Sequence, residues 1–400
     1  MGQNLATNSK QHMTNEIVYV DNNATTCVAP EVFAAMQPFL TEYYGNPSSV
    51  YPFSGVAAKV IDQARASLAA LLGATPEEII FTSCGSESDS TAIMSALATQ
   101  AGRRKILTTV VEHPAVLNVC HKLQKQGIHV DYLGVDGQGR IDLDEARALI
   151  SSDTALVTVM LANNEIGNIY PVLELAELAH AKGALFHTDA VQAVGKIPID
   201  LSSSAIDFLS LSGHKLHAPK GVGALYRRRS VPFEPFLAGG HQEHGQRAGT
   251  ENVAGIAALG KAAELAQQHL ATEAVQLAAL RDRLQAGLLA SCPDVLVNGD
   301  LQHRLPNTLN VCFKYIEGEA ILLHLYQAGK ICASSGSACT TGSLEPSHVL
   351  RAMGLDYQAL HGSIRFSFSR YNTDRDVDLI LAVMPGIVKA LRELSPFGRN

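Results

Sequence analysis

A lysine follows a short apolar run, in a position where a ligand could reach it. The run IDFLSL (206–211) leads into Ser212, Gly213, His214 and Lys215, and the glycine allows the backbone to turn sharply. An amine held there can form a Schiff base with an aldehyde when its surroundings lower its pKa. An exposed lysine at a turn is the alternative interpretation. The motif therefore indicates a ligand site only in combination with other motifs of the sequence.

A carboxylate follows a second apolar run. Asp189 comes after ALFH (184–187), and Gln192 stands three residues further along the chain. The ring nitrogen of pyridoxal 5'-phosphate (PLP) keeps its proton when it faces a buried carboxylate, and this proton lets the ring accept electrons. Gln192 could then hydrogen-bond the phenolic oxygen. A helix N-cap is the alternative role for Asp189.

Two further motifs offer contacts for a phosphate group and for a planar ring. FTSCGSESDS (81–90) passes from a strand through Gly85 into a helix, with Ser86 and Asp89 at capping-box spacing. Free N–H groups at a helix N-terminus beside a hydroxyl suit a phosphate, although a capping role alone explains the serine. His113 follows another apolar run and could stack on a cofactor and move protons. A structural histidine is the alternative.

One thiol stands apart from the other six cysteines. Cys339 lies in ASSGSACTTGS (333–343), whose small residues predict a mobile segment with little to bury. The other cysteines are scattered without a CxxC motif, which favours buried side chains over a disulfide framework or a zinc site. A thiol on a mobile segment can move between a buried site and an external acceptor. An incidental cysteine in a flexible loop is the alternative.

Short apolar runs alternate with amphipathic stretches over the first 230 residues. The helical patterns at 86–100, 114–126 and 171–182 lie between these runs. This alternation indicates a mostly parallel α/β sheet, with its ligand site at the carboxyl ends of the strands. The runs that indicate strands buried on both faces are 79–82, 105–110, 128–133, 154–160, 184–187, 206–211 and 222–226.

The pattern changes after about residue 250 to long Ala- and Leu-rich helices over 252–290. A second alternating region ends in a helical pattern that begins at Thr373 and is interrupted by Pro385. Its other elements are strands near 295–297, 308–313 and 364–368 and a helix at 318–328. We therefore expect a flexible tail at 1–16, a large domain at 17–265 and a smaller α+β domain at 266–400 that carries Cys339.

Composition excludes several classes of protein. A chain of 400 residues with 46% hydrophobic and 17% charged residues can fold into large cores. The net charge of −7, without a long basic run, argues against nucleic acid or an anionic membrane as a partner. The sequence contains neither an apolar stretch long enough to span a membrane nor an N-terminal signal peptide. We expect a cytoplasmic protein.

The motifs together resemble those of the group I cysteine desulfurases. These are homodimeric PLP enzymes of aminotransferase fold type I, class V, with a seven-stranded sheet in the large domain. The resemblance covers about residues 17 to 395 and is closer to the nitrogen-fixation-associated NifS type than to the housekeeping IscS type. The motifs that carry it are DNNATT (21–26), GNPSS (45–49), SCGSESDS (83–90), VVEHPAV (110–116), ANNEIG (162–167), HTDAVQAVGK (187–196), SLSGHK (210–215), RAGTEN (247–252) and SSGSACTTGSLEPSHVLRAMG (334–354).

The resemblance implies how the cofactor would be held. Lys215 would bind PLP covalently, Asp189 would face the ring nitrogen, Gln192 the phenolic oxygen, and His113 would stack over the ring. Asn164 would contact both the cofactor and the substrate. The phosphate group would be bound by Gly85, Ser86, Ser212 and His214 of the same subunit. Thr250 of the partner subunit would also contact it.

The resemblance also implies a reaction. Asn164 and Arg365 would bind the carboxylate of L-cysteine, and the thiolate of Cys339 would take its sulfur as a persulfide, leaving L-alanine. The persulfide would pass to an iron–sulfur scaffold protein, in a role linked to nitrogenase maturation. Cys339 would also be a transient ligand of an iron–sulfur cluster, which is the sole metal site expected.

Three alternatives remain at this point: a selenocysteine lyase, another class V PLP transaminase, and a catalytically silent protein of this fold that binds a scaffold. The thiol in SSGSAC argues against a transaminase, which needs none. The presence of both Lys215 and Cys339 argues against a silent protein. The chain departs from the family pattern at Ser86, where Thr is frequent, at His244, where Arg is common, and at Ala218, where Gly is common.

Overall fold

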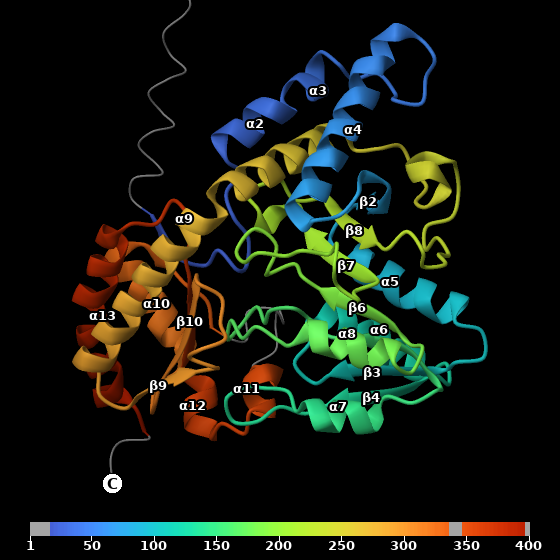
Figure 1. The fold of residues 1–400 in the computed structure, drawn as a ribbon. Coiled ribbons are helices and arrows are strands. Elements are labelled where there is room, and N and C mark those ends of the chain that lie inside the picture. The colour runs from blue at the N-terminus through green and yellow to red at the C-terminus, as the bar shows by residue number, and fades with distance from the viewer. Residues whose placement is uncertain (1–16, 336–345, 397–400) are drawn as a thin grey trace, which may run out of the picture.

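The computed structural model describes residues 17–335 and 346–396, so Cys339 lies outside the described residues. The described chain forms a large α/β domain and a smaller domain, and the long helix α9 (Val253–Ser291) runs from one to the other (Figure 1). Within these ranges, none of the helices has the length and apolar character needed to cross a membrane.

The large domain is built on a seven-stranded sheet with the strand order β2-β8-β7-β6-β5-β3-β4. β8 runs antiparallel to β2 and β7, and the other pairings are parallel, which confirms the prediction of a mostly parallel sheet. The strands are β2 (Ile79–Thr82), β3 (Lys105–Thr109), β4 (His129–Leu133), β5 (Thr154–Thr158), β6 (Leu185–Asp189), β7 (Phe208–Ser212) and β8 (Gly223–Arg227).

Helices cover both faces of this sheet, because its strands carry apolar side chains on both sides. Ile80 and Ile106 pack in one core with α5 and α6, whereas Phe81 and Leu107 pack in another with α4, α8 and the first half of α9. The helices of this domain are α2 (Pro30–Met36), α3 (Pro38–Thr41), α4 (Pro52–Leu72), α5 (Gly85–Thr99), α6 (Pro114–Gln124), α7 (Leu143–Leu149) and α8 (Val172–His180), with short 3-10 turns η1 (Pro76–Glu78), η2 (Gly213–Lys215) and η3 (Gln242–Gly245).

Helix α9 belongs to both domains. Leu259 and Ala266 pack in the core of the large domain, whereas Leu277 and Leu284 pack in the core of the small one. The sequence boundary between 265 and 266 therefore falls inside a continuous helix rather than in a linker. A continuous helix joins the two halves of the molecule.

The small domain contains an antiparallel sheet of the order β12-β10-β9 and a two-stranded parallel pair, β1 with β11. Its elements are β1 (Val18–Tyr19), β9 (Val295–Asn298), β10 (Thr308–Phe313), β11 (Ile331–Cys332), β12 (Ser363–Ser367), α10 (Gly318–Gly329), α12 (Tyr357–His361) and α13 (Asp374–Leu394). The short helix α11 (His348–Ala352) instead packs on the core of the large domain through Val349 and Leu350. The start of the described chain therefore packs here, and not in the large domain as the sequence suggests: Val18 pairs with Ile331, and Val20 joins this core. A two-residue strand carries no periodicity, so this long-range pairing has no local signal.

The last helix differs from its prediction. α13 runs from Asp374 to Leu394 with Pro385 inside it, although a proline removes one backbone donor from a helix. Its buried face, which includes Ile380, Met384 and Val388, packs on the core on both sides of the proline. This packing holds the helix together across Pro385.

Candidate active site

A cavity of about 400 Å³ lies where the carboxyl ends of β6 and β7 meet the N-terminus of α5. This is the edge at which parallel sheets place their ligands, and the volume suits a small cofactor with its substrate. Arg365 belongs to the second domain and completes the cavity wall. The cavity is lined by Asn23, Ala24, Cys84, Gly85, Ser86, Asp89, His113, Met160, Ala162, Asn164, Asp189, Val191, Gln192, Ser212, His214, Lys215 and Arg365.

Asp189 ends β6 and is buried at the cavity wall, with 6% of its surface exposed. The backbone N–H of Val191 donates to its Oδ1 at 2.9 Å, which fixes the carboxyl group. Burial raises the pKa of Asp189, and the charges of His113 and Lys215 act in the opposite direction. A buried carboxyl with these neighbours can hold a proton between itself and a basic nitrogen placed opposite.

The N-terminus of α5 forms the second wall. Gly85 is its first residue, and a Cβ added there would lie 2.7 Å from Cγ2 of Val191, so the close packing requires glycine. The N-cap is Cys84 without a side-chain hydrogen bond, which leaves the first-turn N–H groups directed at the cavity edge. Phosphate is a natural ligand for such a helix end, with the hydroxyl of Ser86 beside it.

The capping box that the sequence suggests at Ser86 and Asp89 is not formed, because the N-cap of α5 is Cys84, two residues before Ser86. Near this helix end the side chain of Glu87 instead accepts a backbone hydrogen bond: its Oε2 accepts from the N–H of Ser83 at 2.8 Å. Asp89 instead lies in the cavity wall, 1% exposed, with its Oδ1 3.6 Å from Nε2 of His187.

Lys215 reaches the cavity from η2, directly after β7. Its Nζ donates to the backbone oxygen of Asn23 and, at 2.8 Å, to that of Ala24. The neighbouring His214 lies with Nδ1 3.1 Å from Oγ1 of Thr25. Burial, together with the charges of nearby lysines, lowers the pKa of His214 to about 4, so its ring is neutral near pH 7.

His113 is the N-cap of α6, and its Nδ1 accepts the backbone N–H of Ala115 at 3.1 Å. Burial and the charge of Lys215 lower the pKa of His113, whereas Asp189 raises it. The neutral ring therefore carries its proton on Nε2, because Nδ1 is used as an acceptor. A ring in this state presents a donor and a flat face, but no free lone pair.

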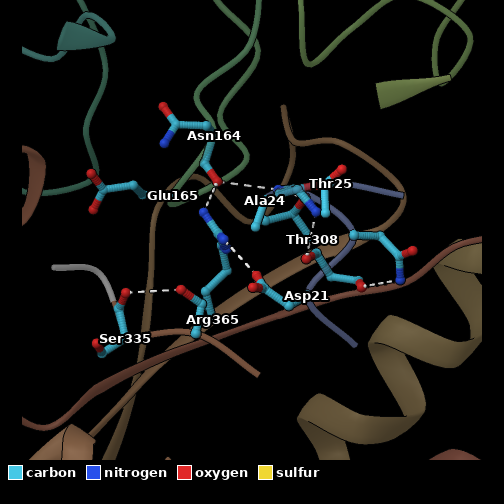
Figure 2. Close-up of polar contacts among 12 residues, drawn as sticks. Asp21, Ala24, Thr25, Asn164, Glu165, Thr308, Ser335 and Arg365 are labelled. Atoms are coloured by element: carbon cyan, nitrogen blue, oxygen red, sulfur yellow. Dashed lines mark hydrogen bonds and ion pairs between the residues drawn. The ribbon is translucent and has the colours of Figure 1, made fainter. Parts of the chain in front are cut away.

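Arg365 extends from β12 of the second domain into the same cavity (Figure 2). Its Nη1 donates to the backbone oxygen of Asn164 at 2.9 Å, and its Nη2 pairs with Oδ1 of Asp21 at 2.6 Å. Its Nε is buried without a hydrogen-bond partner among the described residues. The guanidinium therefore keeps a donor available for an incoming carboxylate.

These residues fit the PLP that the resemblance implies. Arg365, in the cavity wall, holds a guanidinium N–H without a hydrogen-bond partner among the described residues. The glycine at position 85 keeps the first turn of α5 clear of side chains. Anion donors, a carboxyl group and a lysine amine thus surround one volume, which is the donor set that a phosphorylated pyridine aldehyde needs.

The cavity brings together most of the site residues predicted from the sequence. Those that line it are Gly85, Ser86, His113, Asn164, Asp189, Gln192, Ser212, His214, Lys215 and Arg365. Thr250 is exposed and is not among the lining residues, so its predicted phosphate contact stays a prediction about the assembled dimer. The role of Cys339, including the iron–sulfur ligation, also stays a prediction.

Sequence reasoning gave no role to Asn23, which connects several of these groups. Its backbone oxygen accepts from Gln192 Nε2 at 2.9 Å, and its Nδ2 donates to the backbone oxygen of Asn164 at 3.2 Å and to Oγ1 of Thr308 at 2.9 Å. The DNNATT motif contains Asn23 and was the available signal. Its partners lie far away in sequence, so no local pattern could assign the role.

Comparisons with known proteins agree with this geometry. A model of the aminotransferase class V family matches residues 18–380. The chain is 60% identical over 381 residues to a cysteine desulfurase of Trichormus azollae, with 95% of each chain covered. It is 57% identical over 381 residues to the cysteine desulfurase NifS of Azotobacter vinelandii, covering 95% of this chain and 94% of the relative. A solved structure of a NifS-like protein superposes with a TM-score of 0.88 at 39% identity, covering 94% of this chain and all of the other.

Proposed function

The chain belongs to the class V aminotransferase family, among its NifS-type cysteine desulfurases, and from this premise we propose that Cys339 receives the sulfur of L-cysteine as a persulfide. The observation that carries the proposal is the convergence of Lys215, Asp189, His113 and Arg365 on one cavity. Each of these side chains supplies a different function that desulfuration requires.

Lys215 would bind the cofactor covalently in this cavity, and four other groups would hold it in place. The first turn of α5 and the side chains of Ser212 and His214 would bind its phosphate, and Asp189 would keep a proton on its ring nitrogen. When bound, PLP supplies an electron sink for the bonds of the substrate that break. His113 would cover one face of the ring.

Lys215 is the residue that we assign to proton transfer at the Cα atom of the substrate. His113 is the alternative, but its Nδ1 accepts the N–H of Ala115 and its Nε2 carries the ring proton. The lone pair of its Nδ1 is therefore already engaged by a backbone hydrogen bond. The amine of Lys215 has that capacity once it is unprotonated.

The sulfur-transfer step needs a thiolate. The thiolate of Cys339 attacks the substrate sulfur, an S–S bond forms, and the Cβ–S bond of L-cysteine breaks. The carbon fragment keeps the electron pair of the broken bond, takes up a proton and leaves as L-alanine. The persulfide sulfur is then passed to an acceptor thiol.

The proposal includes three statements about the setting of the reaction. The enzyme is a homodimer in which Thr250 of the partner subunit adds to the phosphate site. The acceptor is an iron–sulfur scaffold protein, and the NifS names of the relatives favour a link to nitrogenase maturation. The location is the cytoplasm, since a reactive thiol requires a reducing compartment.

A turnover assay tests the proposed function. The purified protein loaded with PLP should convert L-cysteine to L-alanine, with one alanine formed for each sulfur delivered to a thiol reductant. Alanine and sulfide are measured in the same sample. An alanine yield without matching sulfur would contradict the proposal, as would keto-acid production from an added amino acid, which would indicate a transaminase.

Arg365→Lys should weaken substrate binding. A lysine keeps the positive charge but lacks the planar fork of donors that reaches Asn164 and Asp21 and leaves one N–H for a substrate carboxylate. The loss of a charged hydrogen bond predicts a KM for L-cysteine that is roughly 10-fold to 100-fold higher. Arg283→Lys, at an exposed ion pair with Asp374, is the matched control and should leave KM unchanged. An unchanged KM in Arg365→Lys would remove Arg365 from the substrate site.

A further inference from the structure

A second lysine lies just behind the cavity, and the mechanism above does not use it. Lys196 lies four residues after Gln192 in the chain. Its Nζ donates to Oε1 of Gln192 at 2.8 Å and to Oδ1 of Asn23 at 3.5 Å. It lines a small cavity behind Lys215, together with Glu273 and other residues of the second domain. Lys196 therefore contacts the cofactor site through Gln192 and not directly.

The two partners of Gln192 determine which way its amide group points. Protonated Lys196 can only donate a hydrogen bond, so the amide atom facing it is the oxygen. The backbone oxygen of Asn23 can only accept, so the atom facing it, at 2.9 Å, is the nitrogen. The orientation thus follows from the chemistry of both neighbours and does not depend on which atom is labelled oxygen.

This orientation fixes what Gln192 offers to a ligand. Its oxygen is occupied by Lys196, and one of its two N–H groups is occupied by Asn23. The remaining N–H is a donor, in a side chain that lines the cavity and is 5% exposed. A ligand oxygen opposite Gln192 would therefore be met by a donor and never by an acceptor.

We propose that Lys196 is a positioning residue that locks the Gln192 amide with its N–H toward the phenolic oxygen of PLP, so that this oxygen is held without its proton. The inference rests on the proposed cofactor site. It assigns to Lys196 an indirect effect on the protonation of the phenolic oxygen, which acts through the amide group of Gln192.

The charged groups around Lys196 are consistent with this role. Burial, followed by the charges of Lys215 and Arg365, lowers the pKa of Lys196 to about 7. His217, Glu273 and Arg370 line the small cavity on its other side. Below that pKa the ammonium holds the amide oxygen most strongly. Above it the neutral amine still has N–H groups to donate, and Asn23 keeps the amide nitrogen in place.

The test is a pH titration of the visible absorption of the PLP-loaded protein. Lys196→Met removes the donor and its charge, so the phenolic oxygen should bind its proton more strongly. We expect the midpoint of the absorption change to move upward by about one pH unit. Lys196→Arg keeps a donor for the amide oxygen and should restore the midpoint toward that of the unmodified protein.

Two comparisons separate this role from a general effect of charge. Gln192→Met should also raise the midpoint, and the double variant Lys196→Met with Gln192→Met should move it no further than Gln192→Met alone. Lys220→Met removes another charge, which acts on His214, without touching Gln192, and should leave the midpoint unchanged. An additive shift in the double variant would overturn the inference.

The outcomes also separate this inference from the proposed function. If neither the unmodified protein nor any variant shows a visible absorption band with PLP, the proposed cofactor site is wrong. If the band is present and Lys196→Met titrates at the midpoint of the unmodified protein, the inference about Lys196 fails while the cofactor site stands. A thermal melt of each variant identifies any that fails to fold, and Lys196→Leu takes the place of Lys196→Met if that variant does.

Discussion

Replacing Cys339 by serine is expected to abolish sulfur transfer while leaving PLP binding intact. A serine hydroxyl is almost fully protonated near pH 7 and is a weak nucleophile toward sulfur, whereas the thiolate is the reactive form of cysteine. We expect sulfide release from L-cysteine to fall by about 10³-fold or more, as for the loss of other catalytic nucleophiles. The visible absorption of the PLP-loaded variant should match that of the unmodified protein.

Two other cysteines make this prediction specific. Cys332 is half-buried in β11, and burial raises the pKa of its thiol, so Cys332→Ser should keep normal sulfide release. Cys84 lines the cavity and is the rival nucleophile. If Cys339→Ser still releases sulfide at the normal rate and Cys84→Ser does not, the assignment of the nucleophile is wrong.

Replacing Lys215 by alanine is expected to stop turnover before any sulfur is transferred. The variant loses the amine that the proposal assigns both to binding PLP and to moving the Cα proton of L-cysteine. Loss of a positioned base alone costs about 10² to 10⁴ in rate, and the loss of the covalent attachment adds to it. We expect alanine formation to fall by at least about 10³-fold.

Lys220→Ala is the matched control for Lys215→Ala, because Lys220 is a nearby lysine that does not line the cavity. It should retain the alanine formation of the unmodified protein. Comparable alanine formation by Lys215→Ala would remove Lys215 from the mechanism. PLP bound to Lys215→Ala should also be lost on gel filtration, which measures the attachment separately from the rate.

Much of the fold could be predicted from the sequence because the sheet is buried on both faces. Apolar runs indicate all seven strands, but two of these runs stop short of the strand end at the site. The run at 184–187 became β6 (Leu185–Asp189), and the run at 206–211 became β7 (Phe208–Ser212). Polar residues at these strand ends keep their pairing, as Asp189 does with Ser210, while facing the cavity. The apolar pattern therefore locates each of these strands but not the polar residues at its end, which line the site.

The local motifs gave those site residues that follow a strand directly. Lys215, Asp189 and Gly85 all stand at a strand end, where a parallel sheet places its ligands. Arg365 and Asn164 came only from the family resemblance, because the contact between them joins two domains and 201 residues of sequence. Lys196 ends the motif HTDAVQAVGK (187–196), but the motif assigns it no role, since that role depends on the orientation of one amide group.

The measurement that tests the account most directly is the mass of the peptide that contains Cys339 after the PLP-loaded enzyme meets L-cysteine without reductant. The account predicts that this peptide gains the mass of one sulfur atom in the unmodified protein and gains none in Lys215→Ala. Alanine formation with the extra sulfur on Cys84, or on no cysteine of the chain, would contradict it.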